Sequence, residues 1–181
     1  MKRVAIVLCL VAFATAGVLA VPQGFKVIKE FLTGYEEVPA LSTSGNGVFN
    51  AKISSDESRI EWELSYADLE SAVQQAHIHI GNVSVNGGIT VFLCTNLGNG
   101  PAGIQPCPPA PATISGVIVA ADVSPNIPAT AGGRAQGIDT GEIDELIAAI
   151  RAGATYVNVH TTVRTGGEIR AQIGGDRGHG H

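Results

Sequence analysis

Short segments of alternating apolar and polar residues recur along the chain and constrain its fold more than any other feature of the sequence. They are rich in β-branched and aromatic residues and are separated by Gly, Pro and Asn, a pattern typical of strands joined by turns. The segments span residues 25–32, 47–53, 58–66, 75–80, 89–94, 113–120, 155–162 and 168–173. Parallel strands need helical crossovers, and the chain offers one helical segment. We therefore predict an all-β fold, an antiparallel β-sandwich or barrel of about eight short strands with one α-helix in the C-terminal half.

The one helical segment lies between Thr140 and Gly153. Thr140 is predicted to cap its start, and Gly153 is predicted to end it in the left-handed conformation. Acidic residues in the first turn suit the positive end of the helix dipole. The apolar residues that share one face are Ile143, Leu146, Ile147 and Ile150. We expect this face to pack over one end or edge of the sandwich.

The first twenty residues have the features of a secretory signal peptide. Lys2 and Arg3 precede an almost wholly apolar run from Val4 to Val18, and small residues stand at positions suited to signal peptidase. The run is slightly too short to span a bilayer, and an uncleaved membrane helix is the alternative. We predict that residues 1–20 are removed and that the mature protein is secreted, to the extracellular space or to the periplasm.

The charge of the chain narrows the choice of partners. The sequence has 11 basic and 16 acidic residues and a net charge of -5. Loss of Lys2 and Arg3 with the signal peptide leaves 9 basic residues and a net charge of -7. An acidic chain is a poor partner for nucleic acids and anionic membranes. We predict no nucleic-acid partner, no membrane association after signal cleavage, and binding to an extracellular protein or matrix ligand of unknown identity.

Two cysteines, Cys94 and Cys107, remain once Cys9 leaves with the signal peptide. An even pair in an exported protein indicates a disulfide bond, which here would close the Gly- and Pro-rich loop 95–106. The alternative is a pair of buried free thiols.

Histidines are the candidate ligand-binding residues of this chain. His77 and His79 are one residue apart in a predicted strand, so both imidazoles point to one face of the sheet. Two histidines with this spacing can chelate one metal ion. Asn158 and His160 likewise share a face of their predicted strand, and valines occupy the opposite face.

The last two predicted strands are joined by a hairpin sequence at residues 165–167, so we expect them to pair antiparallel. In the final strand the polar residues Glu168, Arg170 and Gln172 alternate with apolar ones. A register that keeps the apolar residues together also keeps the polar ones together. We therefore expect His160 to neighbour Glu168, Arg170 and Gln172.

The order of these motifs resembles the CHRD (chordin-type) domain. The motifs are the His-x-His strand, a Phe-Leu-Cys strand with a Cys-Pro loop, the acidic amphipathic helix, Tyr-Val-Asn-Val-His-Thr-Thr and a closing Gly-Glu-Ile-Arg-Ala-Gln-Ile. The resemblance implies a secreted β-rich domain whose signature includes the equivalents of His77, His79, His160, Glu168 and Arg170. It implies no established activity. The chain lacks the cysteine-rich modules that accompany CHRD repeats in chordin, so growth-factor binding is not carried over.

The resemblance also divides the chain. Residues 1–20 are expected to be the signal peptide, 21–30 an N-terminal segment, 31–174 the CHRD domain and 175–181 a flexible His/Gly tail. The tail histidines could bind metal, but ordering a flexible segment costs entropy and makes such binding weak.

Asn82 begins the sequon Asn-Val-Ser, which is glycosylated only in a eukaryotic secretory pathway.

The histidine face has three interpretations. In the first, the three histidines bind one copper or zinc ion, with Glu168 beside them. In the second, they form a structural network of hydrogen bonds with Asn158, Glu168 and Gln172. In the third, they line a solvent-exposed patch that contacts a partner or polymer.

We predict an exported, non-catalytic CHRD protein that acts as an extracellular binding module, with metal binding through the histidine face as its candidate chemistry. One alternative is a copper- or zinc-dependent redox enzyme of superoxide-dismutase-like architecture, in which Arg170 guides an anion to the metal. The chain lacks the further histidines and the aspartate of such a bimetallic site, and fold analogy alone does not give function. A purely structural secreted domain is the other alternative.

Overall fold

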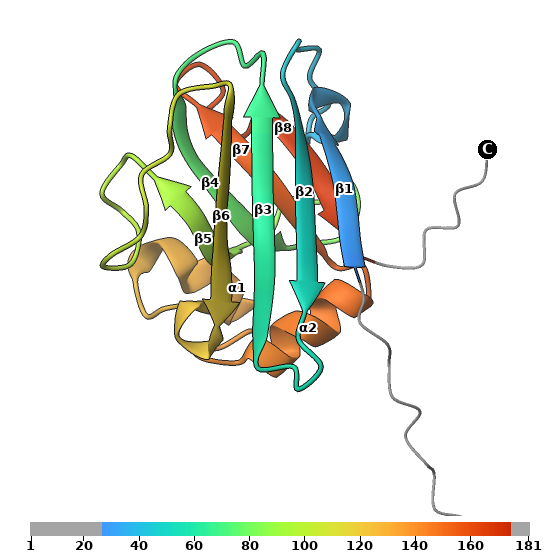
Figure 1. Cartoon of the computed structure of the whole chain (residues 1–181), viewed down its shortest axis with the longest axis vertical. Helices are drawn as coiled ribbons and strands as arrows, with labels where there is room; N and C mark the ends of the chain where they lie inside the picture. The colour runs from blue at the N-terminus through green and yellow to red at the C-terminus, as the bar shows by residue number, and fades with distance from the viewer. Residues whose placement is uncertain (1–26, 175–181) are drawn as a thin grey trace, which may run out of the picture.

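The structure, a computed structural model, describes residues 27–174 and contains the eight strands that the alternating pattern predicts. The strands are β1 (Val27–Thr33), β2 (Asn46–Ile53), β3 (Arg59–Ala67), β4 (Val73–Ile80), β5 (Ile89–Thr95), β6 (Ala112–Val119), β7 (Thr155–Thr161) and β8 (Ile169–Ile173). They form one antiparallel sheet that curls into a nearly closed barrel (Figure 1). The predicted all-β fold is confirmed. The predicted signal peptide (1–20) and the His/Gly tail (175–181) lie outside the described residues.

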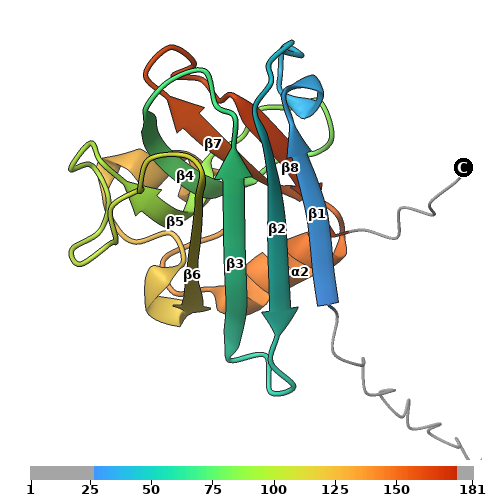
Figure 2. The same ribbon diagram turned by 45° about the horizontal axis from the view of Figure 1, so that its top comes forward.

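Two layers of the sheet face each other across the hydrophobic core. The strand order is β5-β4-β7-β8-β1-β2-β3-β6. In Figure 1, β6, β3, β2 and β1 stand in front of β5, β4, β7 and β8, which cross behind them at an angle, and Figure 2 shows the same layers from a turned view. In β2 and β3 buried residues such as Phe49 and Leu64 alternate with more exposed ones. β7 and β8 are instead buried on both faces, so their polar residues lie under loops.

β5 and β6 are the two ends of the sheet and face each other at the seam of the barrel. The side chain of Gln105 bridges them, because its Nε2 donates to the carbonyl oxygens of Leu93 in β5 and Ser115 in β6, at 3.1 and 3.2 Å. The backbone N–H of Thr95 donates in turn to the carbonyl oxygen of Gln105, at 3.1 Å. The segment between β5 and β6 therefore covers the seam.

The predicted disulfide between Cys94 and Cys107 is confirmed. Both cysteines are buried, and the bond fastens the segment that covers the seam to β5. The side chain of Asn96 adds to this anchor. Its Nδ2 donates to the carbonyl oxygen of Cys107 at 2.9 Å, and its Oδ1 accepts from the N–H of Cys107 at 3.1 Å.

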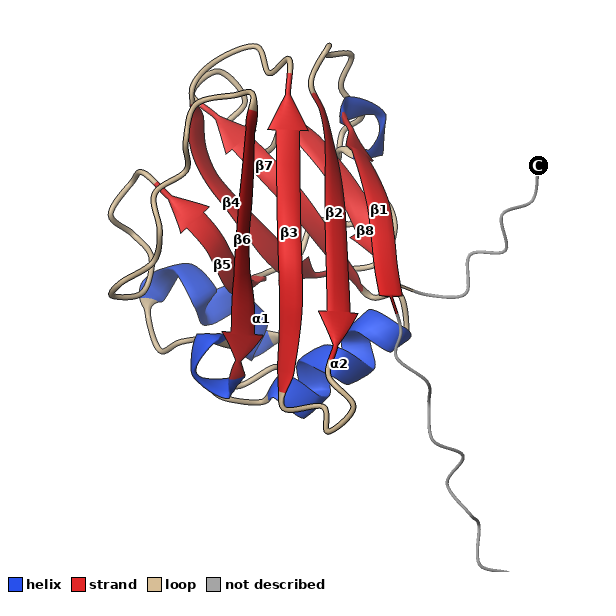
Figure 3. Cartoon of the chain, in the orientation of Figure 1, coloured by secondary structure: helices blue, strands red, loops and turns tan. Residues whose placement is uncertain are grey.

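The predicted helix corresponds to α2 (Ile143–Arg151), which crosses one end of the barrel (Figure 3). Its buried residues Leu146, Ile147 and Ile150 belong to the core, as the predicted apolar face requires. A second, shorter helix, α1 (Ala131–Ala135), was not predicted. No helix within residues 27–174 is long and apolar enough to cross a membrane.

Of the two predictions for the ends of α2, one is confirmed and the other is wrong. Gly153 follows the helix with a φ of 68°, so the predicted left-handed stop is confirmed. The predicted cap by Thr140 is wrong, because its Oγ1 donates to the carbonyl oxygen of Ser124 at 2.7 Å and the helix begins three residues later. Thr140 thus joins α2 to the preceding loop instead of closing the first helical turn.

Replacing Cys94 and Cys107 together with alanine should lower the free energy of unfolding by about 3 kcal/mol. The reason is that a disulfide closing a loop of about 15 residues restricts the unfolded chain by roughly that amount. Urea denaturation of the variant and of the oxidised wild type measures the difference. Wild-type protein treated with a reductant should move towards the variant, and an unchanged midpoint in the variant would contradict a stabilising role for the bond.

Candidate metal centre

β4 and β7 bring the three histidines of the sequence analysis together. Their antiparallel register sets His77 opposite Asn158 and His79 opposite Tyr156, with His160 two residues farther along β7. Because alternate residues of a strand point to opposite faces, the imidazoles face away from the apolar core. They are nevertheless buried, with exposed fractions of 0% for His77 and 6% for each of the other two.

Two loops cover the histidines and orient their rings. His79 Nδ1 lies 2.9 Å from the carbonyl oxygen of Gly87, in the loop between β4 and β5. His160 Nδ1 lies 2.9 Å from the carbonyl oxygen of Thr165, in the loop between β7 and β8. A carbonyl oxygen only accepts, so each Nδ1 carries a proton and donates. The Nε2 atoms of these two neutral rings keep their lone pairs, and this is the form in which imidazole binds metal ions.

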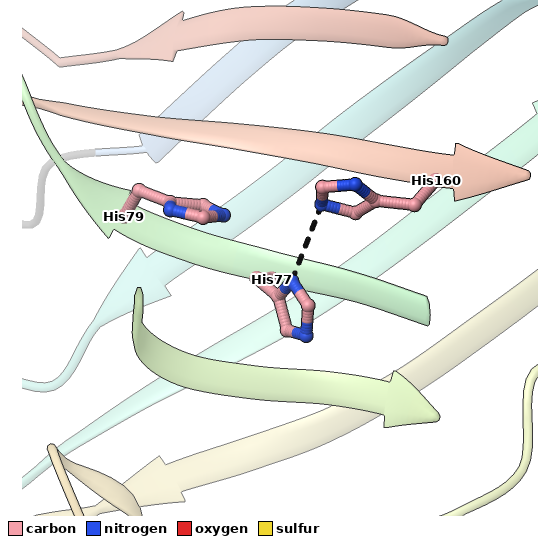
Figure 4. A group of neighbouring side chains, drawn as sticks. All are labelled: His77, His79 and His160. Atoms are coloured by element: carbon pink, nitrogen blue, oxygen red, sulfur yellow. Dashed lines mark hydrogen bonds between the residues drawn. The ribbon is translucent and has the colours of Figure 1, made fainter. Parts of the chain in front are cut away.

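His77 completes the cluster. Its Nδ1 lies 3.3 Å from His160 Nε2, and Figure 4 shows these two rings facing each other, with His79 farther along β4. One ring nitrogen of each histidine lies within 4.8 Å of the other two. Since His160 Nε2 is an acceptor, His77 Nδ1 donates to it. Transfer of this proton to His77 Nε2 would free the Nδ1 lone pair of His77 for a metal ion.

The spacing of the nitrogens fits a small metal ion. A tetrahedral ion with metal–nitrogen bonds of about 2.0–2.1 Å holds its ligand nitrogens about 3.3–3.4 Å apart. The 3.3 Å between His77 Nδ1 and His160 Nε2 matches this value. A nitrogen pair at the 4.8 Å limit would have to close by about 1.4 Å to reach this tetrahedral spacing.

Burial keeps the three imidazoles neutral. Loss of hydration lowers the pKa of His77 well below 6.5, and the neighbouring His160 and His79 lower it further. Burial lowers the pKa of His79 to about 3, although its hydrogen bond to Gly87 acts in the opposite direction. The pKa of His160 is also lowered by burial, against the opposing effect of the Thr165 carbonyl. At neutral pH no proton competes with a metal ion for these lone pairs.

Several buried acceptor atoms of this face lack hydrogen-bond partners among the described residues. They are His77 Nε2, His79 Nε2, Asn158 Oδ1 and Glu37 Oε1. The Asn158 carboxamide interacts with both Glu37 and His79, so these groups lie close together. Unsatisfied buried acceptors are costly unless water or an ion pairs with them. The unpaired Nε2 of His79 supports a site for a cation, whereas Nε2 of His77 would carry the proton in the metal-binding tautomer.

Glu168 and Gln172, which we expected beside the histidines, make their hydrogen bonds elsewhere. The Glu168 carboxylate accepts from Thr43 Oγ1 at 2.9 Å, from the Glu70 N–H at 2.8 Å and from Thr161 Oγ1 at 2.7 Å. Both carboxylate oxygens are used in these bonds, which join two loops to the end of β7. Gln172 Nε2 donates to two backbone carbonyl oxygens, at 2.7 and 2.8 Å.

Arg170 positions the loop that covers the three histidines. It is almost fully buried, and its Nη2 donates to the carbonyl oxygens of Asn82 and Val85 in the β4–β5 loop, at 3.2 and 3.0 Å. Its guanidinium carbon lies 3.5 Å from the centroid of the Tyr156 ring. The same ring stacks on His79, with centroids 4.6 Å apart and planes 5° from parallel. Arg170 therefore supports His79 through both the loop and the tyrosine.

Two residues of this face were missed at the sequence level. Tyr156 shares the alternation that assigned Asn158 and His160 to one face, so its position could have been found. Glu37 lies in the distant loop after β1, and no periodic signal places it here. Its carboxyl group occupies space that only a glycine at position 167 leaves open, since a Cβ there would collide with it.

The interpretation of the histidines as a solvent-exposed partner patch is wrong, because the β4–β5 and β7–β8 loops bury all three rings. Asn82, the predicted glycosylation residue, is exposed in the β4–β5 loop, and its glycosylation stays a prediction.

The barrel and the buried histidine cluster define a small, disulfide-bonded all-β domain with a candidate metal centre. A family model described as CHRD domain matches residues 29–173. The chain therefore belongs to the CHRD domain family, and the resemblance found in its motifs is confirmed. Searches of curated proteins and of solved structures gave no match.

Acid should destabilise the metal-free protein through its buried histidines. Because their pKa values in the folded state lie below 6.5, the unfolded chain binds protons that the folded chain does not. This stability is fully present above pH 6.5 and is lost as the pH falls towards the folded-state values, by up to about 1.4 kcal/mol per pH unit for each histidine. Urea denaturation with a chelator, repeated from neutral pH down to about pH 5, measures the decline.

Glu37 provides the matched control for the acid destabilisation predicted from the histidines. Burial raises its pKa from 4.5 to about 7, although Arg170 opposes the shift. Its contribution to stability is thus present below pH 4.5 and is lost as the pH rises towards 7, opposite to the trend of the histidines. Glu37→Gln removes this opposing trend, so the variant should lose stability more steeply on acidification. Equal slopes would contradict the role of Glu37, and stability that rises on acidification would contradict that of the histidines.

Proposed function

We propose that the protein is an exported, non-catalytic binding module that holds one copper or zinc ion between His77, His79 and His160. The observation that carries the proposal is the convergence of three buried, neutral imidazoles, two of them held by backbone carbonyls with their Nε2 lone pairs available. Imidazole nitrogen is a ligand that both ions favour. Membership of the CHRD family supports a binding role.

The surrounding residues suit a bound cation. Asn158 links His79 to Glu37, whose buried carboxyl group would offset part of the charge of the ion in its ionised form. The bound ion would supply a positively charged, Lewis-acidic centre in a site shielded from water. Hydrogen bonds from Nδ1 to backbone carbonyls fix the ring orientation, as is common for histidine ligands.

Export is supported by two independent features. The first twenty residues have the charge and hydropathy pattern of a signal peptide. The Cys94–Cys107 disulfide is compatible with an oxidising compartment, extracellular or periplasmic.

Burial of the centre favours binding over redox turnover. All three rings lie under the β4–β5 and β7–β8 loops, so a substrate would have to displace a loop to reach the ion. The redox-enzyme alternative predicts turnover by the metal-loaded protein, and a superoxide or peroxide assay tests it directly.

Titration of the metal-free mature protein with Cu(II) and Zn(II) tests the proposal. We expect one ion per chain and an upward shift of the thermal midpoint, because a ligand at about 100 times its Kd stabilises the folded state by about 2.7 kcal/mol. His79→Ala and His160→Ala should each weaken binding at least about tenfold, since each removes one of three ligands. Nitrogen hyperfine couplings in the electron paramagnetic resonance spectrum of the Cu(II) form identify the imidazole ligands directly.

The matched control uses the histidines outside the described residues. A variant with His179→Ala and His181→Ala should keep the high-affinity site. Loss of binding in this variant, or unchanged uptake in a variant that lacks all three proposed ligands, would refute the metal centre. If that triple variant fails to fold in the absence of metal, the histidines have a structural role. The electron paramagnetic resonance spectrum of the Cu(II)-loaded wild type then shows whether they also bind the metal: an absence of nitrogen couplings would refute the metal centre.

A further inference from the structure

We propose that a second site, a cavity between the loop after β1 and the β4–β5 loop, binds a single neutral saccharide unit. The cavity has a volume of about 320 Å³. It lies at the lower end of the size range of small-molecule sites, roughly 300–1,000 Å³, which suits one sugar ring. The lining residues on which the argument rests are Tyr35, Glu36, Glu37, Val83, Ser84 and Arg170. The site does not require the metal centre.

Hydrogen bonds fix the two walls of the cavity relative to each other. Asn86 Nδ2 in the β4–β5 loop donates to the carbonyl oxygen of Val38 in the opposite wall, at 3.0 Å. Arg170 Nη1 in the floor donates to Asn86 Oδ1 at 3.2 Å. Together with the bonds from Nη2 to the same loop, these contacts hold the cavity open in the unliganded protein. A preformed site loses little entropy when its ligand binds.

An exposed apolar rim surrounds the entrance. Tyr35 is 72% exposed and Val83 is 62% exposed, although both are large apolar residues. They come from opposite walls of the cavity. The face of an aromatic ring is electron-rich, so it packs well against the C–H face of a sugar ring, whose hydrogens carry a small positive charge. Tyr35 is thus suited to form the stacking platform of the site.

The charges of the lining select a neutral ligand. Glu36 and Glu37 provide two carboxyl groups against the single guanidinium of Arg170. An anion would be repelled by the carboxyl groups, and the guanidinium of Arg170, which interacts with both glutamates, offsets much of their attraction for a cation. Hydroxyl groups avoid both penalties, because each can donate to a carboxylate and accept from another donor.

Glu37 gives the floor of the cavity a polar group suited to a hydroxyl. It is almost fully buried, and its carboxyl group interacts with the Asn158 carboxamide while it also lines the cavity. Burial raises its pKa to about 7, so both protonation states are populated at neutral pH. A hydroxyl group pairs with either state, as a donor to the carboxylate or as an acceptor from the acid. Ser84 adds a hydroxyl from the opposite wall.

Titration of the metal-free mature protein with methyl glycosides of glucose, galactose and N-acetylglucosamine tests the proposal. We expect at least one glycoside to bind and to shift the backbone amide resonances of residues 34–40 and 81–88. Tyr35→Ala should weaken this binding about tenfold, as expected for loss of an aromatic contact. Phe31→Ala is the matched control, because Phe31 is also an exposed aromatic residue but lies outside the cavity, and this variant should bind as the wild type does.

Three results would overturn the proposal. They are the absence of binding by all three glycosides, unchanged binding in Tyr35→Ala, and tighter binding of glucuronate or sulfate than of the neutral glycosides, which would indicate an anion site. Copper and zinc titrations of the same samples report on the metal centre separately. Failure of the saccharide site therefore leaves the proposed function intact, and failure of metal binding leaves the saccharide site to be judged by its own titration.

Discussion

The antiparallel register of β4, β7 and β8 is the constraint on which the rest of the structure depends. It sets His77 opposite Asn158, and Asn158 opposite Arg170. A shift of one residue would exchange the two faces of a strand and move imidazoles into the apolar core. In most sheets only one face opposes such a shift. Here both faces are buried, so the register is fixed by core packing on one side and by specific polar contacts on the other.

The β4–β5 loop links the two candidate sites that this register creates. The carbonyl oxygen of Gly87 orients His79, and that of Val85 accepts from Arg170. One side of the loop therefore covers the histidine cluster, while the other forms a wall of the cavity beside Tyr35. Both sites depend on a loop that is held by side chains of β8, although neither needs the ligand of the other.

The strands and the shared histidine face could be predicted because alternation and hairpin turns are local signals. The pairing of β4 with β7, which brings His160 beside His77 and His79, could not be predicted, because the two strands are far apart in the sequence and no local signal pairs them. The burial of the face could not be predicted, because the loops that cover it come from other parts of the chain, as Glu37 does. Glu168 was misplaced for a physical reason: it precedes β8, so its carboxylate turns towards Thr161 and two loops instead of following the alternation. The cap by Thr140 failed in the same way, because a tertiary partner competed with the local one.

The seam between β5 and β6 has a consequence for the solubility of the chain. Unpaired strand edges are templates on which other chains can form strands, and proteins commonly block them with charges, bulges or covering segments. In this barrel the two edges face each other, and the segment carrying Gln105 lies over both. The disulfide holds that segment in place. Oxidation of two thiols therefore fixes the segment that blocks both edges, where another chain could otherwise add a strand.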